Sequence, residues 1–195
     1  MVRQYGTKQP CVTSGHSDSE VTIMKTLIIY YSHTGNNEAL ANELRQRLDG
    51  ELLKVVERRK RTNLTILLDL IFRRTPPIKP PDRDLTGYDR LILIAPIWAG
   101  RIATPLVAFI AREKERFEHY AFITLCTGPD GQLEKITDEL RRLSGKEPKA
   151  VMELKINDLL LPEQRNKIKY ATNFRVKKEH FAFFEQDIER FLTAL

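Results

Sequence analysis

The sequence predicts an α/β fold with a doubly wound, five-stranded parallel sheet, because short apolar runs alternate with helical patterns along the chain. A length of 195 residues, with 42% hydrophobic and 30% charged residues, suits one globular domain. We therefore expect strands over residues 27–31, 51–56, 91–95, 121–125 and 150–156.

Apolar residues at helical spacing predict the elements that connect these strands. Asp49-Gly50 ends the first helix, and Thr104-Pro105 supplies the N-cap and first residue of a later one. A proline-rich stretch over residues 75–81 can be neither helix nor central strand. The expected helices cover residues 36–48, 64–72, 104–115, 132–143 and 178–195.

Residues 1–23 have a different composition from the remainder of the chain. They are rich in Ser, Thr, Gly and charged residues and lack the apolar core of a signal peptide. Met24 directly precedes the first strand pattern. We expect residues 1–23 to be a disordered extension and residues 24–195 to form the folded domain.

The formal net charge of +6 is concentrated in two segments. Residues 54–84 hold nine Lys or Arg against four acidic residues, and residues 163–180 hold six against two. No nucleic-acid-binding motif accompanies them, so a solvated basic face is the plainer interpretation and no nucleic-acid partner is expected. Residues 58–74 suit either packing on the sheet or peripheral contact with an anionic membrane or an acidic redox protein.

The two cysteines, Cys11 and Cys126, lie far apart and form no disulfide framework or zinc pattern, which favours a cytoplasmic location. No histidines are spaced as metal ligands, and no metal site is expected. No apolar run approaches the ~18 residues of a membrane-spanning helix.

The candidate ligand-binding residues follow three predicted strands, because open parallel sheets bind ligands beyond the carboxyl ends of their strands. The first loop is Ser32-His33-Thr34-Gly35-Asn36-Asn37. Unpaired N–H groups at a helix N-terminus attract a phosphate, and a glycine lets the backbone approach it closely. The same residue types also suit simple helix capping, and His33 either touches the phosphate or faces solvent. The Gly-Lys-Ser/Thr ending of a P-loop and the dinucleotide-binding glycine motif are both absent.

The second loop is Pro96-Ile97-Trp98-Ala99-Gly100, and it contains the only tryptophan of the chain. A planar ring between Pro and Gly either covers a flat heteroaromatic ligand or folds back over the edge of the sheet. The third loop, Thr127-Gly128-Pro129-Asp130-Gly131, is a tight turn that exposes its backbone. Cys126, just before it, is expected to be a small buried residue and not a nucleophile.

Two of these motifs resemble the flavodoxins. Residues 27–37, with the sequence Leu-Ile-Ile-Tyr-Tyr-Ser-His-Thr-Gly-Asn-Asn, resemble the FMN phosphate loop, and residues 88–100 resemble the second flavin loop. The resemblance implies the strand order 2-1-3-4-5 and one bound FMN. Residues 32–37 would hold the phosphate, and residues 96–100 and 127–131 would flank the isoalloxazine ring.

The chain departs from the flavodoxin pattern in two respects. Asn37 stands where the family usually has threonine; an asparagine can still donate a hydrogen bond, so we expect altered affinity and not loss. The sequence pI of about 9.3 differs from the acidic character typical of flavodoxins that carry electrons.

The function predicted from these features is FMN-dependent redox chemistry, with the protein binding and tuning the flavin. A reductase of a small acceptor such as a quinone is favoured, because residues 57–84 and 157–177 are long enough to wall a pocket near the flavin. The alternatives are a flavodoxin-type electron carrier between redox proteins and a non-enzymatic module that binds another phosphate ligand. No catalytic residue is assigned, and the oligomeric state stays open.

Overall fold

A computed structural model of the chain describes residues 24–58, 74–127 and 131–195. The expectations for the extension over residues 1–23, for the helix over residues 64–72, and for Gly128, Pro129 and Asp130 lie outside the described residues.

The centre of the molecule is a five-stranded sheet in which every neighbouring pair of strands is parallel. Its order is β2-β1-β3-β6-β7, which is the predicted order 2-1-3-4-5 once a small hairpin outside the sheet is left out of the numbering. The predicted fold class and strand order are therefore confirmed. The strands are β1 (Thr26–Tyr30), β2 (Glu51–Lys54), β3 (Arg90–Ile94), β6 (Tyr120–Cys126) and β7 (Val151–Lys155).

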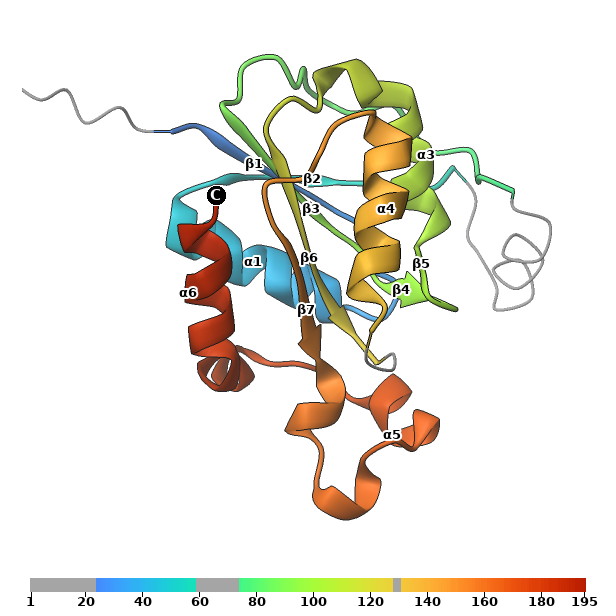
Figure 1. The fold of residues 1–195 in the computed structure, drawn as a ribbon, viewed down its shortest axis with the longest axis vertical. Helices are drawn as coiled ribbons and strands as arrows, with labels where there is room; N and C mark the ends of the chain where they lie inside the picture. Colours follow the sequence, from blue (N-terminus) through green and yellow to red (C-terminus); the bar gives the residue numbers. More distant parts are fainter. Residues whose placement is uncertain (1–23, 59–73, 128–130) are drawn as a thin grey trace, which may run out of the picture.

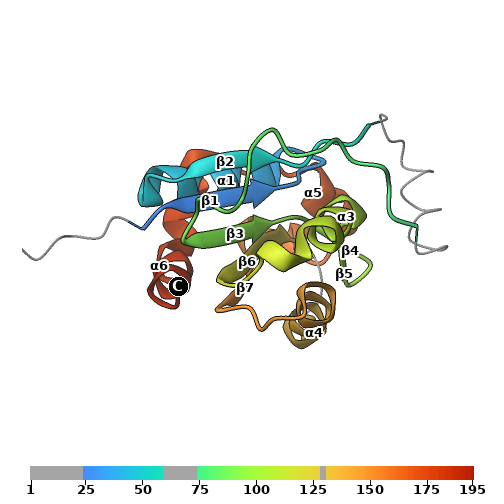
Figure 2. The same ribbon diagram turned by 90° about the horizontal axis from the view of Figure 1, so that it is seen from above.

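Helices cover both faces of the sheet (Figures 1 and 2). Alternate residues of the central strands point to opposite faces, so Ile29 packs with α3 and α4 while Ile28 packs with α1 and α6. Both faces are therefore closed to water, which explains why the strands are almost continuously apolar in sequence. The helices are α1 (Asn36–Leu48), α3 (Thr104–Glu113), α4 (Leu133–Ser144) and α6 (Glu185–Thr193).

Three local predictions are corrected by the structure. The N-cap of α3 is Ala103 and not Thr104, so the helix begins one residue earlier than Thr104-Pro105 suggested. The last predicted helix is divided into a 3-10 helix, Lys178–Phe184, and α6. The loop after β3 contains a hairpin of β4 (Ile97–Trp98) and β5 (Arg101–Ile102). The sequence did not predict this hairpin, because strands of two residues are too short to leave a periodic pattern.

The chain between β7 and α6 extends beyond the carboxyl ends of β6 and β7 (Figure 1). Before the 3-10 helix Lys178–Phe184, it contains two shorter 3-10 helices, Ile156–Leu159 and Pro162–Gln164, and α5 (Ile168–Asn173). The sequence predicts no regular structure there, since a six-residue helix is too short to show helical periodicity. Among the described helices, none is both long enough and apolar enough to cross a bilayer.

Candidate functional site

The carboxyl edge of the sheet brings the three predicted loops together around one groove of about 190 Å³. Eight of the predicted site residues line it: His33, Thr34, Asn36, Asn37, Pro96, Ile97, Trp98 and Thr127. Ser32, Gly35, Ala99, Gly100 and Gly131 belong to the same loops but are not among its lining residues. The groove lies where the chain leaves β1 in one direction and β3 in the other, which is the switch point of this strand order.

The first wall of the groove is the N-terminus of α1. Gly35 has a φ of 92°, a left-handed conformation that glycine adopts without strain, and its N–H donates to Ser32 Oγ over 3.1 Å. No described side chain caps the helix, so the first N–H groups of α1 are available to an anionic ligand. A Cβ placed on Gly35 would meet no atom within 4 Å, so there is open space at this point.

The side chains of Asn36 and Asn37 are engaged with other parts of the chain. Asn36 Nδ2 donates to the Phe174 carbonyl and its Oδ1 accepts from the Val176 N–H, at 3.0 Å each. Asn37 makes the same paired contact with the backbone of Leu125, at 3.1 and 3.0 Å. The carbonyl oxygen and one N–H of the Asn37 amide are thus bonded to Leu125, and its second N–H is left for the donation expected from this side chain. Both residues line the groove, and their backbone N–H groups lie in the first turn of α1.

The second wall is the β4–β5 hairpin, which carries Trp98. Ala99 and Gly100 form its two-residue turn with φ values of 49° and 74°, the positive values that a type I′ turn requires. Trp98 meets the rings of Tyr31 and His33 edge to face, with centroids 5.8 and 6.1 Å apart. His33 is exposed but packs its ring against Trp98 and so joins the first wall to the second.

The third wall is the end of β6. Cys126 is buried, as predicted, and Gln132 Nε2 lies 3.6 Å from its sulfur. Glu153 Oε1 lies 3.9 Å from the same sulfur. Burial raises the pKa of Glu153, although hydrogen bonds from Gln132 and Cys126 oppose this shift. A carboxyl group that is harder to ionise than usual therefore lies behind the groove.

The fourth wall is formed by residues that were not selected from the sequence. Ile156 follows β7, and Ala171 and Thr172 belong to α5; all three line the groove. The signal for Ala171 and Thr172 in the sequence is the length of the segment over residues 157–177, which predicted a pocket wall, whereas Ile156 was predicted only as the end of a strand. No described residue of the other long segment, 57–84, lines this groove.

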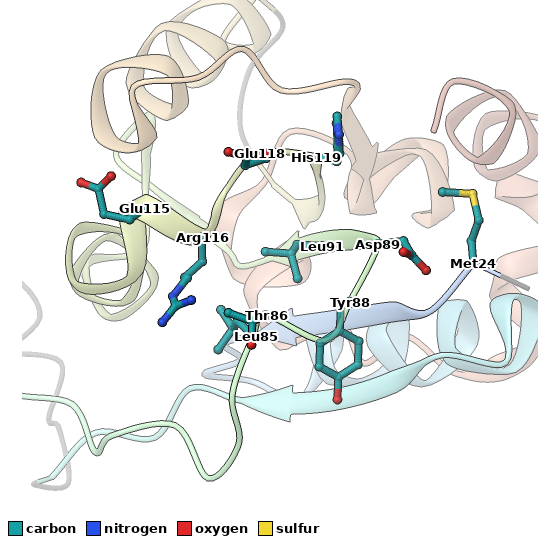
Figure 3. A pocket seen from close by; sticks show the side chains of 10 residues that line it. All are labelled: Met24, Leu85, Thr86, Tyr88, Asp89, Leu91, Glu115, Arg116, Glu118 and His119. Atoms are coloured by element: carbon teal, nitrogen blue, oxygen red, sulfur yellow. The ribbon is translucent and has the colours of Figure 1, made fainter.

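A second cavity, of about 500 Å³, lies at the opposite edge of the sheet (Figure 3). Met24, Asp89 and His119 line it and stand just before strands β1, β3 and β6. Exposed charged residues such as Glu115, Arg116 and Glu118 complete it, and none of the predicted site residues takes part. In the described ranges no three His, Cys, Asp or Glu residues are grouped so that they could hold a metal ion.

Comparisons with known proteins agree with the topology. No protein-family model and no curated protein sequence matches the chain. A flavoprotein from Lactobacillus acidophilus NCFM, crystallised in complex with FMN, is 21% identical with a TM-score of 0.56; the match covers 67% of this chain and 93% of that one. A protein from Bacteroides eggerthii DSM 20697 is 18% identical with a TM-score of 0.60, covering 67% of this chain and 88% of that one.

The chain has a flavodoxin-like fold. Within this fold, the groove lies between the first and second loops, at the same switch point where flavodoxin-like sheets bind their ligands.

Proposed function

We propose that this flavodoxin-like protein binds one FMN in the groove and uses it for redox chemistry. The observation that carries the proposal is the pairing of an uncapped helix N-terminus with a tryptophan-bearing hairpin across one groove. The helix end suits a phosphate and the indole suits a flat heteroaromatic ring. The Lactobacillus acidophilus flavoprotein of similar fold, which is crystallised with FMN, supports the same conclusion.

The phosphate would be held by the backbone N–H groups at the start of α1, with the Ser32 and Thr34 hydroxyls beside them. No Lys or Arg occurs within residues 32–44, so the helix dipole and neutral donors supply the attraction. The groove is smaller than the ~300–1,000 Å³ of a typical ligand pocket, so part of the flavin would stay exposed. An exposed part of the flavin suits a cofactor that must exchange electrons with another molecule.

Binding is tested by titrating the apoprotein with FMN. The expected result is saturable quenching of flavin fluorescence at one equivalent, with a higher melting temperature, because a ligand that binds only the folded state stabilises it. FAD and NADPH serve as comparison ligands and should give weaker effects. The proposal fails if saturating FMN causes neither quenching nor a shift in melting temperature.

Bound FMN supplies hydride or single-electron transfer, and the chain's own residues bind and orient it. Two uses of this chemistry are each supported by one observation. Ile156, Ala171 and Thr172 wall the groove, which supports a reductase of a small acceptor such as a quinone. The small volume of the groove instead supports an electron carrier with no separate substrate pocket.

Steady-state oxidation of NADH and NADPH with quinone acceptors separates the two uses, with free FMN as the control. Turnover well above that control indicates the reductase. Turnover equal to it, together with rapid electron exchange with a flavoprotein reductase, indicates the carrier.

A further inference from the structure

We propose that the exposed basic surface around α5 is the docking site for an acidic redox protein that exchanges single electrons with the bound flavin. This inference rests on the proposed FMN binding and adds the partner's chemistry and its place of contact. Six side chains form the surface, which we call the basic α5 surface: Arg165, Lys167, Lys169, Arg175, Lys177 and Lys178.

The charges of the basic α5 surface are exposed and outnumber the two acidic residues of the same stretch, Glu163 and Glu179. All six residues are exposed, and none forms an ion pair with an acidic residue of the described chain. Arg47, by contrast, is paired with three glutamates on α1 and α6. An unpaired cluster projects a positive field into solvent, and such a field steers oppositely charged partners and selects against basic ones.

The basic α5 surface adjoins the groove. Ala171 and Thr172 of α5 line the groove, while Lys167 and Lys169 of the same short segment are exposed. In Figure 1 the segment extends beyond the carboxyl ends of the strands, the edge of the sheet at which the groove lies. A protein that docks here would place its own redox centre next to the exposed part of the flavin.

Two exposed apolar side chains favour a protein as the partner. Leu161 is 57% exposed and Tyr170 is 40% exposed, both in the segment that carries the basic residues. Aromatic and apolar anchors within a ring of charge are typical of protein interfaces. A membrane-binding helix needs a long amphipathic face, whereas α5 has six residues.

The segment is also held in place before any partner arrives. The Asn36 side chain binds the backbone of Phe174 and Val176, and Arg165 Nε donates to the Leu160 carbonyl over 3.1 Å. The Asn157 side chain contacts Asn166 as both donor and acceptor. A preorganised surface loses less conformational entropy when it binds.

In each productive encounter one electron passes between the partner's redox centre and the FMN, so that one is oxidised as the other is reduced.

The test uses the FMN-loaded full chain with a plant-type iron–sulfur ferredoxin as the acidic probe and a basic cytochrome c as the counter-probe. Stopped-flow absorbance measures electron exchange, and fluorescence anisotropy measures binding, between about 0.02 and 0.3 M salt. We expect faster association with ferredoxin than with cytochrome c. The association rate constant with ferredoxin should fall by about tenfold or more as the salt concentration rises.

A charge-reversal variant locates the contact. Lys167→Glu, Lys169→Glu and Lys178→Glu together should slow association with ferredoxin by about 10–100-fold at low salt. The matched control is Lys114→Glu, Lys146→Glu and Lys149→Glu, three exposed residues that precede β6 and β7 at the opposite edge of the sheet. It makes the same change in net charge and should alter the rate by less than about threefold.

The FMN dissociation constant of each variant is measured in parallel and should change by less than about twofold, because none of the substituted residues lines the groove. Equal rates for the two variants would overturn the docking surface while leaving FMN binding intact. So would loss of FMN from the α5 variant alone, or an effect seen only with anionic vesicles or duplex DNA. Failure of wild-type protein to bind FMN would instead overturn the proposed function.

Discussion

Asn37 offers a sharp test of how the groove is built, because its side chain completes the sheet at the point where β3 stops. β3 ends at Ile94, which pairs with Ile123, while β6 continues to Cys126. The backbone N–H and carbonyl of Leu125 therefore have no β3 partner, and the Asn37 amide takes the place of the missing strand. Asn37→Ala removes both hydrogen bonds at once.

The size of the effect follows from burial. Asn37 is 3% exposed and Leu125 is 2% exposed. A buried polar group left without a partner costs about 1–3 kcal/mol, and the substitution leaves two such groups on Leu125. Both residues line the groove, so water can enter and reduce the penalty. We expect the free energy of unfolding to fall by about 2–4 kcal/mol.

Urea denaturation of the apoprotein, followed by circular dichroism, measures this change. With a slope of roughly 2 kcal/mol per molar urea, the midpoint should fall by about 1–2 M. Asn42→Ala is the matched control: its amide binds the Glu38 carbonyl on an exposed face of α1, so its effect should stay within about 0.5 kcal/mol. Asn37→Thr replaces the amide with one hydroxyl, which can restore one of the two hydrogen bonds, so its stability should lie between the two. If Asn37→Ala is as stable as Asn42→Ala, the amide is not completing the sheet and the reasoning is refuted.

Three further predictions concern the other walls. Trp98→Ala should weaken FMN binding by about 1–3 kcal/mol in fluorescence titration, the scale of a lost aromatic contact, and an unchanged dissociation constant would place the indole away from the flavin. Ala99→Gly should stabilise the fold by up to about 1 kcal/mol in urea, because alanine at a φ of 49° is strained and glycine is not; a loss of stability would contradict this. Burial raises the pKa of Glu153, so its ionisation destabilises the folded state, and stability falls as pH rises from the ordinary value of 4.5 through the raised pKa. Glu153→Gln should therefore raise the melting temperature at pH 8 more than at pH 4. Equal shifts in melting temperature at the two pH values would contradict a raised pKa of Glu153.

The centre of the sheet could be predicted from the sequence because β1, β3 and β6 are buried on both faces. Runs such as residues 91–95 are apolar throughout, and each is followed by a helix with a clear buried stripe. The strand order was implied by the resemblance to the flavodoxins, and the crossovers between parallel strands are almost always right-handed. The same physics placed the loops after β1, β3 and β6 at one edge.

The details of the groove depended on contacts that no local pattern records. Asn36 and Asn37 read as a helix start, but their partners lie 138 residues away at Phe174 and 88 away at Leu125. The β4–β5 hairpin lacks the Asn-Gly signal of its turn type, because alanine fills a position that asparagine or glycine usually takes. α5 is polar and six residues long, so its role as a wall was visible only as an unusually long connection.

The two neighbouring asparagines connect parts of the site that function requires to act together. Their backbone N–H groups stand at the uncapped start of α1, where the phosphate would bind, while Asn36 holds the segment after α5 and Asn37 holds the end of β6. An anion that fixes the first turn of α1 therefore also fixes the bases of two other walls, because the same residues make both kinds of contact. Ordering of the first turn of α1 by the phosphate reduces the entropy cost of binding at the basic α5 surface, and such coupling between two sites is reciprocal. A protein that docks on the basic α5 surface would then favour the flavin-loaded form, and flavin binding would favour docking.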